Sequence, residues 1–363
     1  MMRITTNSTL FNYRYNLMNN TNLMNNAMTK VMTQRQFSSY ATNPAAATRA
    51  FKIHSSLNAA QAQHANNQMV TSKFETAWSN IQGILDDLSD EMGRVPALGG
   101  LNGTNAMDDL DSQALVLRGA AEAIIQSMNA KYDDDYIFAG SDNRNPPFAI
   151  DDDGFITYRG VQIDNPDTLG DEYLGPDGKP VPNPDSPTGG NYTNEEMLQK
   201  WAEDDPLYVD VGLGFALDNN GNVIESTAFD SSISGIDILG YGVDDNGNPK
   251  NLASIMLRLA DVFENYDQNP DYAQAEALVN AFDTSQKAVI DKHAELDVKT
   301  GFLNTNGTQL ESNFDALNTE RYDLEMVNPA DAITELMWAQ TCYSAALQVG
   351  VNVIPQSLMD YLK

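Results

Sequence analysis

Seven apolar residues recur every seven positions in the C-terminal third of the chain, and this repeat constrains the fold more than any other feature. The residues are Phe282, Val289, Leu296, Leu303, Leu310, Leu317 and Leu324. Because an α-helix turns once in about 3.6 residues, such a repeat places all these side chains on one edge of a helix. The companion seam is mostly polar and reads Leu278, Ser285, Lys292, Lys299, Asn306, Asn313 and Glu320. The pattern therefore predicts a long helix with one tightly packed edge inside a bundle, not a free two-stranded coil.

Both ends of the chain carry helical stripes as well. Residues 4–35 predict one amphipathic helix and residues 329–363 predict another. We expect the two to lie side by side in an inner coiled-coil domain made of residues 1–40 and 330–363. The predicted assembly interface of this domain consists of Leu10, Leu17, Met24, Val31, Ile333, Met337, Leu347, Val351, Ile354 and Leu358.

Two further helices are predicted between these ends, over about 49–93 and 108–132. Together with the long heptad helix they predict a helical bundle domain of residues 41–145 and 250–329. The aspartates of the segment KYDDDYIFAG, residues 131–140, are expected to mark the exit of the second of these helices. Tyr136, Ile137 and Phe138 would then begin a buried strand.

Residues 146–249 differ in composition, since they hold ten of the 15 prolines. This segment predicts a β-rich outer domain. FAIDDDGFITYRGVQI and YVDVGLGFALDNNGNVIESTAF are each typical of a hairpin, and ISGIDILGYG predicts a short strand. The predicted fold class is thus mainly α with a β-rich insertion: an elongated antiparallel helical bundle formed by the N- and C-terminal segments, plus an outer β lobe.

Charge restricts the possible partners. The net charge of −30 argues against nucleic acid and against anionic membrane, because both are bound by basic surfaces. Residues 1–74 hold seven basic and no acidic residues, whereas residues 151–250 hold 21 acidic and four basic ones. We expect the basic N-terminal end to attract the acidic C-terminal end. The sequence shows neither a membrane-spanning stretch nor the apolar core of a secretory signal.

No motif in the sequence predicts catalysis, a cofactor or a metal. The loops that start at Asp151, Asp218 and Asp244 only faintly resemble calcium loops, because they lack the EF-hand spacing and flanking helices. Turn chemistry is the favoured interpretation of all three. A glycosidase site in the acidic lobe stays open as an alternative, and it would need two carboxylates roughly 5 to 10 Å apart in one pocket.

Four segments of the chain resemble the flagellin superfamily: MRITTN at the start, YIFAG with the following PPF, SSISGIDILGYG, and AALQVGVNVIPQSLMDYL at the end. Within that superfamily the chain is most similar to the hook-associated proteins of the hook-filament junction. The resemblance covers nearly the whole chain and is weakest in the β lobe. One departure is TQRQFSSYATNPAAA, which replaces a Ser-Gly-Lys/Arg and Asp-Asp-Pro signature common in the family.

The resemblance implies a non-enzymatic axial component of the bacterial flagellum that joins hook to filament through polymerisation of its terminal helices. The implied partners are further copies of the chain, flagellin, the neighbouring hook-associated junction protein, a flagellar export chaperone and the type III export apparatus. The implied location is extracellular, at the junction, after export without a cleaved signal peptide. A flagellin-type filament subunit is the alternative, because its terminal stripes would look alike.

Overall fold

The computed structural model describes residues 6–37, 41, 43–101, 107–184, 186, 189–265 and 272–353. The chain forms two compact units, Met1–Ala62 with Leu310–Lys363, and Gln63–Gln309. Two helices, α2 (Pro44–Gly83) and α9 (Tyr272–Glu325), contribute residues to both units. No helix in the described ranges is both long and apolar enough to cross a membrane.

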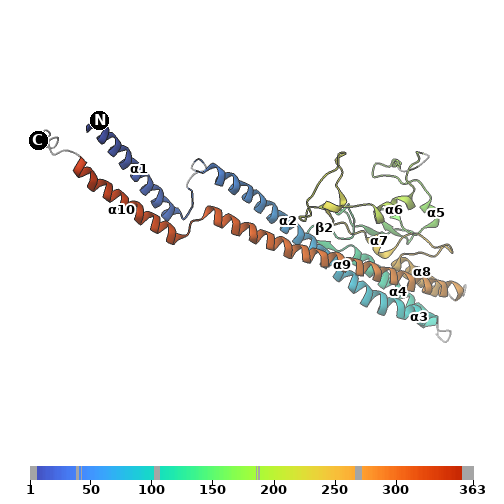
Figure 1. Ribbon diagram of the computed structural model, residues 1–363. Helices are drawn as coiled ribbons and strands as arrows, with labels where there is room; N and C mark the ends of the chain where they lie inside the picture. The colour runs from blue at the N-terminus through green and yellow to red at the C-terminus, as the bar shows by residue number, and fades with distance from the viewer. Residues whose placement is uncertain are drawn as a thin grey trace. The chain divides into compact units, whose positions relative to one another are not determined.

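The first unit contains the two terminal helices, α1 (Thr6–Thr33) and α10 (Pro329–Val353) (Figure 1). They pack side by side in opposite directions, because Lys30 near the end of α1 pairs with Glu335 near the start of α10. At the other end of the pair, Gly350 lies against the ring of Tyr13. The predicted antiparallel packing of the terminal helices is confirmed.

The facing edges of α1 and α10 alternate in steps of three and four residues, as in a coiled coil. On α1 the inward seam is Leu10, Tyr13, Leu17, Asn20, Met24, Ala27 and Val31. On α10 it is Ala332, Leu336, Ala339, Tyr343, Ala346 and Gly350. The α10 seam is therefore built mostly from small residues, and the large side chains come from α1.

The connection from α1 to α2 and the connection from α9 to α10 each end at an Asn-Pro pair. Asn43 caps α2 by accepting the N–H of Ala46 at 3.1 Å, and Asn328 caps α10 by accepting the N–H of Ala330 at 3.0 Å. In both helices proline occupies the first position, where its missing N–H and fixed φ are tolerated. This local chemistry explains why neither terminal helix continues into its neighbour.

The second unit combines a helical core with a β-rich lobe. The helices are the remaining parts of α2 and α9, the π-helical segment η1 (Ile84–Arg94), α3 (Val95–Gly100), α4 (Met107–Met128) and α8 (Leu252–Glu264). Five of the seven heptad residues of α9 are buried and two are half-buried. The tightly packed apolar edge predicted for the long helix is confirmed. The helix predicted over 49–93 is instead divided at Gly83, where the π-helical segment begins, and the one predicted to reach residue 132 ends at Met128.

The lobe consists of short antiparallel strands and short helices. Its three sheets are β1 (Lys131–Tyr132) with β2 (Asp135–Tyr136), β3 (Phe148–Ile150) with β4 (Ile156–Tyr158) and β5 (Val161–Gln162), and β6 (Tyr208–Val209) with β7 (Phe229–Asp230). Its helices are α5 (Pro166–Leu169), α6 (Asn194–Glu203), the 3-10 turn η2 (Glu225–Thr227) and α7 (Gly235–Leu239). Both predicted hairpins are present, and the fold class is mainly α with a β-rich insertion, as predicted.

Three local predictions for the lobe and its border are wrong. The segment ISGIDILGYG forms the helix α7 and not a strand, since its apolar residues also fit a single helical turn that ends at Gly240, where φ is 88°. Asp133 and Asp134 of KYDDDY form a two-residue hairpin turn between β1 and β2, with Asp133 at φ 57°. Ile137 and Phe138 are buried, but they lie in turns and not in a strand.

Candidate assembly interface

The outward face of α1 carries an apolar stripe. Its members are Phe11, Tyr15, Met18 and Met32, exposed by 71%, 55%, 57% and 76%, and all but Tyr15 follow a residue of the inward seam by one position. A groove on α1 is lined by residues of both this face and the inward seam: Ser8, Leu10, Phe11, Arg14, Tyr15, Leu17, Met18 and Thr21. Exposed apolar side chains that cluster as Phe11, Tyr15 and Met18 do make this part of α1 a candidate interaction surface.

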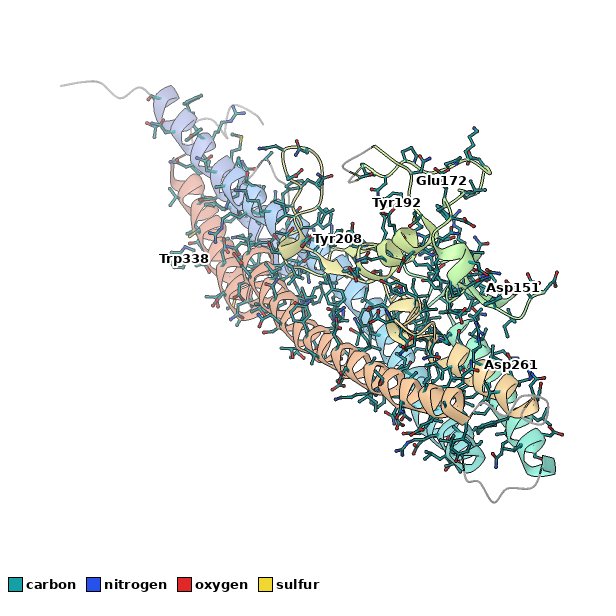
Figure 2. The ribbon with its side chains drawn as sticks, turned by 90° about the vertical axis from the view of Figure 1, so that its right-hand side faces the viewer. Asp151, Glu172, Tyr192, Tyr208, Asp261 and Trp338 are labelled. Atoms are coloured by element: carbon teal, nitrogen blue, oxygen red, sulfur yellow. The ribbon has the colours of Figure 1, made fainter. Side chains whose placement is uncertain are left out.

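The outward face of α10 carries a second stripe, formed by Ile333, Met337, Leu347 and Val351. Trp338 lies beside this stripe, is 71% exposed and points away from α10 (Figure 2). Because small residues form the α10 seam that faces α1, these larger side chains take no part in that seam and remain exposed. The terminal helix pair therefore presents apolar surface on both of its helices.

The predicted interface residues fall into three groups. Leu10, Leu17, Met24 and Val31 are half-buried on the seam between α1 and α10. Ile333, Met337, Leu347 and Val351 lie on the outward stripe of α10. Ile354 and Leu358 lie outside the described residues. The predicted interface did not include Phe11, Met18 and Met32, although these residues widen the apolar stripe of the first helix at a spacing of seven and fourteen residues.

The two connections next to this pair are hydrogen-bonded to each other. The N–H of Gln36 donates to the carbonyl of Glu325 at 2.8 Å, and the N–H of Val327 donates to the carbonyl of Gln34 at 3.0 Å. Glu325 also accepts a 2.6 Å hydrogen bond from Nε2 of His54 on α2. These contacts tie the connection between α1 and α2 to the connection between α9 and α10.

Two of the four segments that carried the sequence resemblance, YIFAG and SSISGIDILGYG, meet at the base of the lobe. Phe138 accepts the N–H of Gly235 at 2.9 Å, and the N–H of Gly140 donates to Ile233 at 3.0 Å. Gly235 has no room for a side chain, because a Cβ there would press into the ring of Phe148. YIFAG and SISGI are thus hydrogen-bonded to each other at the base of the lobe.

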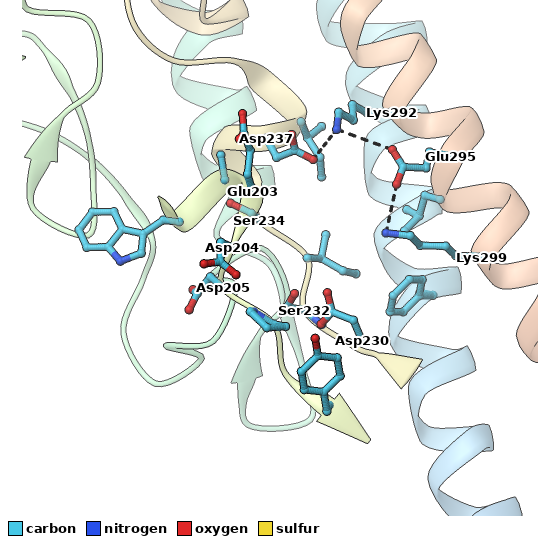
Figure 3. A pocket seen from close by; sticks show the side chains of 18 of the residues that line it. Glu203, Asp204, Asp205, Asp230, Ser232, Ser234, Asp237, Lys292, Glu295 and Lys299 are labelled. Atoms are coloured by element: carbon cyan, nitrogen blue, oxygen red, sulfur yellow. Dashed lines mark hydrogen bonds and ion pairs between the residues drawn. The ribbon is translucent and has the colours of Figure 1, made fainter. Parts of the chain in front are cut away.

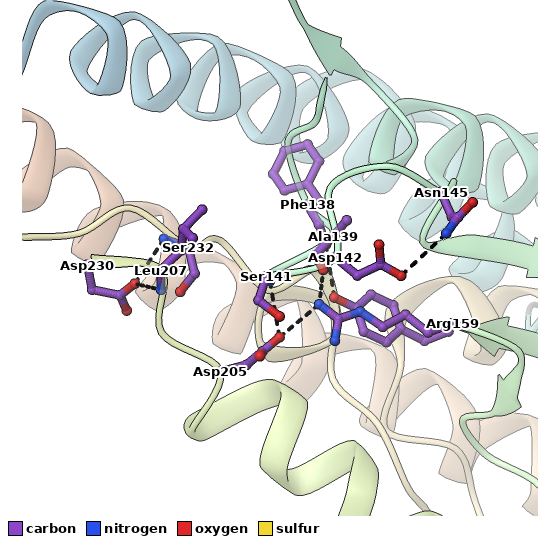
Figure 4. A network of polar contacts seen from close by, with 11 residues as sticks. Phe138, Ala139, Ser141, Asp142, Asn145, Arg159, Asp205, Leu207, Asp230 and Ser232 are labelled. Carbon is purple, nitrogen blue, oxygen red and sulfur yellow. Dashed lines mark hydrogen bonds and ion pairs between the residues drawn. The ribbon is translucent and has the colours of Figure 1, made fainter. Parts of the chain in front are cut away.

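An ion pair reinforces this contact between the two segments (Figure 4). The guanidinium of Arg159 contacts the Asp205 carboxylate at 2.8 Å and also the carbonyl of Ala139. The same carboxylate accepts the N–H of Ser141 at 3.1 Å. Both charged side chains are largely shielded from solvent, at 10% and 20% exposure. The guanidinium also lies 5.2 Å from the ring of Trp201.

The polar seam of α9 binds the lobe. Lys292 pairs with Asp237 of α7 at 2.6 Å. Asn306 donates to the carbonyl of Val211 at 2.7 Å and to the amide oxygen of Asn67 at 2.9 Å, while Asn67 donates to the carbonyl of Leu303 at 3.0 Å. The weak companion seam predicted for the long helix is therefore a docking edge for the lobe, a role that periodicity alone cannot reveal.

A cavity of about 510 Å³ lies between α9 and the lobe, and many of its lining residues are acidic (Figure 3). Its carboxylates mostly serve as structural acceptors. Asp205 binds Arg159, Asp237 binds Lys292, and Asp230 accepts the N–H groups of Leu207 and Ser232 at 2.8 and 3.0 Å. This arrangement fixes the lobe backbone, and these three carboxylates are engaged as acceptors, unlike the free acid and base pair that a glycosidase uses.

The three Asp-rich loops are closed turns. Oδ1 of Asp218 accepts the N–H groups of Asn220 and Asn222 at 2.8 Å, and Oδ1 of Asp244 accepts those of Asn246 and Asn248 at the same distance. The hydrogen bond from the backbone N–H of Asn222 has the largest effect in lowering the pKa of the Asp218 carboxyl below its ordinary value. These carboxylates satisfy their own backbone, as turn chemistry predicts. Within the described ranges, no group of three or more His, Cys, Asp or Glu side chains is placed to hold a metal.

The fold resembles solved structures of flagellar proteins. A provisionally assigned flagellar hook-associated protein from Vibrio parahaemolyticus is 17% identical, with 78% of this chain and 100% of that chain covered and a TM-score of 0.55. FlgL from Bacillus cereus is 15% identical, with 75% and 99% covered and a TM-score of 0.44. Hook-associated protein 3 from Legionella pneumophila is 15% identical, with 75% and 98% covered and a TM-score of 0.46. Neither a family model nor a curated protein matches the sequence. The chain therefore shares its fold with the Vibrio protein.

Proposed function

We propose that the protein is a structural component of the bacterial flagellum, an adaptor that joins hook to filament by polymerising through its terminal helices. The observation that carries the proposal is the fold likeness to the Vibrio hook-associated protein, which is covered over its entire length. The sequence resemblance to the flagellin superfamily agrees with it. The role is structural and involves no catalysis.

The outward stripes of α1 and α10 support assembly through the terminal helices. Exposed side chains such as Phe11, Met18, Met337 and Val351 contribute little to the stability of the monomer. Their burial against other copies would remove apolar surface from water and so stabilise the assembly. We assign these stripes to contacts between subunits and the seam with Leu17 and Met24 to the pair within one subunit. The proposed interface also includes Ile354 and Leu358.

The proposed organisation has three domains. Residues 1–40 and 330–363 form the inner coiled-coil domain, residues 41–145 and 250–329 the helical bundle domain, and residues 146–249 the outer domain. The hydrogen-bonded connections beside Asn43 and Asn328 favour the first boundary. The hydrogen bond between Gly140 and Ile233 favours a separable outer domain.

The proposed partners are further copies of the chain, flagellin and the neighbouring hook-associated junction protein. Before assembly, a flagellar export chaperone would protect the apolar terminal stripes, and the type III export apparatus would deliver the chain. The proposed location is the hook-filament junction outside the cell, reached without a cleaved signal peptide.

Labelling of intact flagella tests the location. A small epitope inserted at Gly178, which lies at an exposed loop tip in the lobe, should give gold-labelled antibody signal in one band between hook and filament. Signal along the whole filament would favour the alternative, a flagellin-type subunit. Absence of signal from flagella of a motile strain that produces the tagged chain would contradict both.

Substitutions on the outward stripe test the assembly mechanism. Met337→Asp combined with Val351→Asp should block incorporation into flagella, because charge would enter a surface buried between copies. The monomer should keep its thermal midpoint within a few degrees, since both side chains are exposed. The matched control is Thr341→Asp, which adds a carboxylate at another exposed position of the same helix. Normal incorporation of the double variant would refute the assigned interface.

A further inference from the structure

Charge is divided between the two sides of the first unit. Its N-terminal side, residues 6–62 of α1 and α2, contains five basic residues and no acidic one: Arg14, Lys30, Arg35, Arg49 and Lys52. Its C-terminal side, residues 310–353 of α9 and α10, has one basic residue, Arg321, and seven acidic ones: Glu311, Asp315, Glu320, Asp323, Glu325, Asp331 and Glu335. One side of the unit is basic and the other is acidic.

Only part of this charge is used within the unit. Lys30 pairs with Glu335 at 2.9 Å and Arg49 with Glu320 at 3.8 Å. Several exposed charges have no ion-pair partner among the described residues. They are Arg14, Arg35 and Lys52 on the basic side, and Glu311, Asp315, Asp323 and Asp331 on the acidic side. The unpaired charges of the two sides have opposite sign and similar number.

We propose that a second copy of the chain docks with its basic α1/α2 side against the acidic α9/α10 side of the first. This inference rests on the proposed function and specifies how its subunits meet. Burial of the outward stripes on α1 and α10 would supply affinity. The charges would set the direction of docking, because complementary charges select orientation more than they add affinity.

This docking has a geometric consequence. Each copy contributes a different side to the contact, so it leaves one basic side and one acidic side free for further copies. Such head-to-tail association grows until it closes into a ring or continues as a helix. Pairing of like sides, which would end at a dimer, places three unpaired cations against three others and is disfavoured. The charge pattern thus favours an extended array over a closed dimer.

Two charge-reversed variants of the full chain test the inference. The first carries Arg14→Glu, Arg35→Glu and Lys52→Glu, and the second carries Glu311→Lys, Asp315→Lys and Asp323→Lys. Sedimentation at low salt should show that each alone needs a concentration about tenfold higher than wild type to assemble, equivalent to about 1.4 kcal/mol. An equimolar mixture of the two should assemble near the wild-type concentration, because each acidic side then meets a basic side of the other variant.

Mixing separates contacts between copies from contacts within one copy, since an intramolecular defect is not repaired by a partner chain. The matched control for the second variant is Asp152→Lys with Asp153→Lys and Asp245→Lys, which raises the net charge by the same amount at exposed lobe positions and should leave assembly unchanged. Circular dichroism melts verify that all variants fold. Wild-type-like assembly of both triple variants, or a mixture no better than its components, would overturn the inference and leave the proposed function standing. A wild-type chain that stays monomeric throughout would overturn both.

Discussion

The ion pair between Arg159 and Asp205 should anchor the base of the lobe, and a double-mutant cycle can measure its contribution. The perturbations are Arg159→Met, Asp205→Asn and their combination. Arg159→Met leaves a shielded carboxylate without its counter-ion and removes the contact to Ala139. Removal of one partner from a buried pair costs about 3 to 5 kcal/mol. Because Asp205 is 20% exposed, we expect the low end, about 3 kcal/mol.

Asp205→Asn should cost slightly less, about 2 kcal/mol, because the amide oxygen can still accept the N–H of Ser141. The double variant should cost about 2 kcal/mol less than the sum of the single variants, since the second substitution removes a charge already left unpaired. The internal control is Arg118 with Asp261 and Glu264, a cluster with side chains 36% to 51% exposed. Arg118→Met should cost about 1 kcal/mol or less.

Urea unfolding of the full chain, followed by tryptophan fluorescence, provides the assay. Trp201 stands 5.2 Å from the Arg159 guanidinium and reports directly on the lobe base. Trp78→Phe and Trp338→Phe in the background remove the other two signals. A coupling energy below about 0.5 kcal/mol, or an Arg118→Met cost as large as that of Arg159→Met, would refute the reasoning.

Three further predictions concern other parts of the chain. Asn67→Ala should lower the free energy of unfolding by about 1 to 3 kcal/mol in urea melts, because it removes the hydrogen bonds of the buried Asn67 amide to Asn306 and to the carbonyl of Leu303, and an unchanged midpoint would contradict this. Burial raises the pKa of Asp164 above its unfolded value, so its contribution to stability is present at low pH and is lost as pH rises towards the folded pKa. Asp164→Asn should therefore raise Tm at pH 7 and lose this gain at pH values near or below 3.8, and a lower Tm at pH 7 would refute the assignment. Gly350→Val should reduce helix content in thermal melts by separating α10 from α1, and Tyr13→Ala in the same chain should restore it, since the clash is with that ring.

The lobe shows how far local sequence signals reach. The hairpin turns at Asp151 and Asp218 could be predicted because turn residues satisfy their own backbone, whatever surrounds them. Helix α6 was missed, although Thr193 and Glu196 form a capping box that the sequence spells out. Helix α7 could not be separated from a strand, since five residues with three apolar positions fit either period.

The sequence by itself determined where the terminal helices run and where they break from α2 and α9. The apolar heptad of α9 favours burial of one helix edge, whichever element packs against it. The Asn-Pro pairs at Asn43 and Asn328 start new helices, because each Asn side chain caps the helix that follows it. Only the tertiary structure decided which stripe of α10 faces α1. Hydrophobicity selects the stripe with Ile333 and Met337, yet the pair closes on the small residues around Ala339, because the large side chains of α1 already fill the space between the helices. The apolar residues left outside are the ones that we assign to assembly.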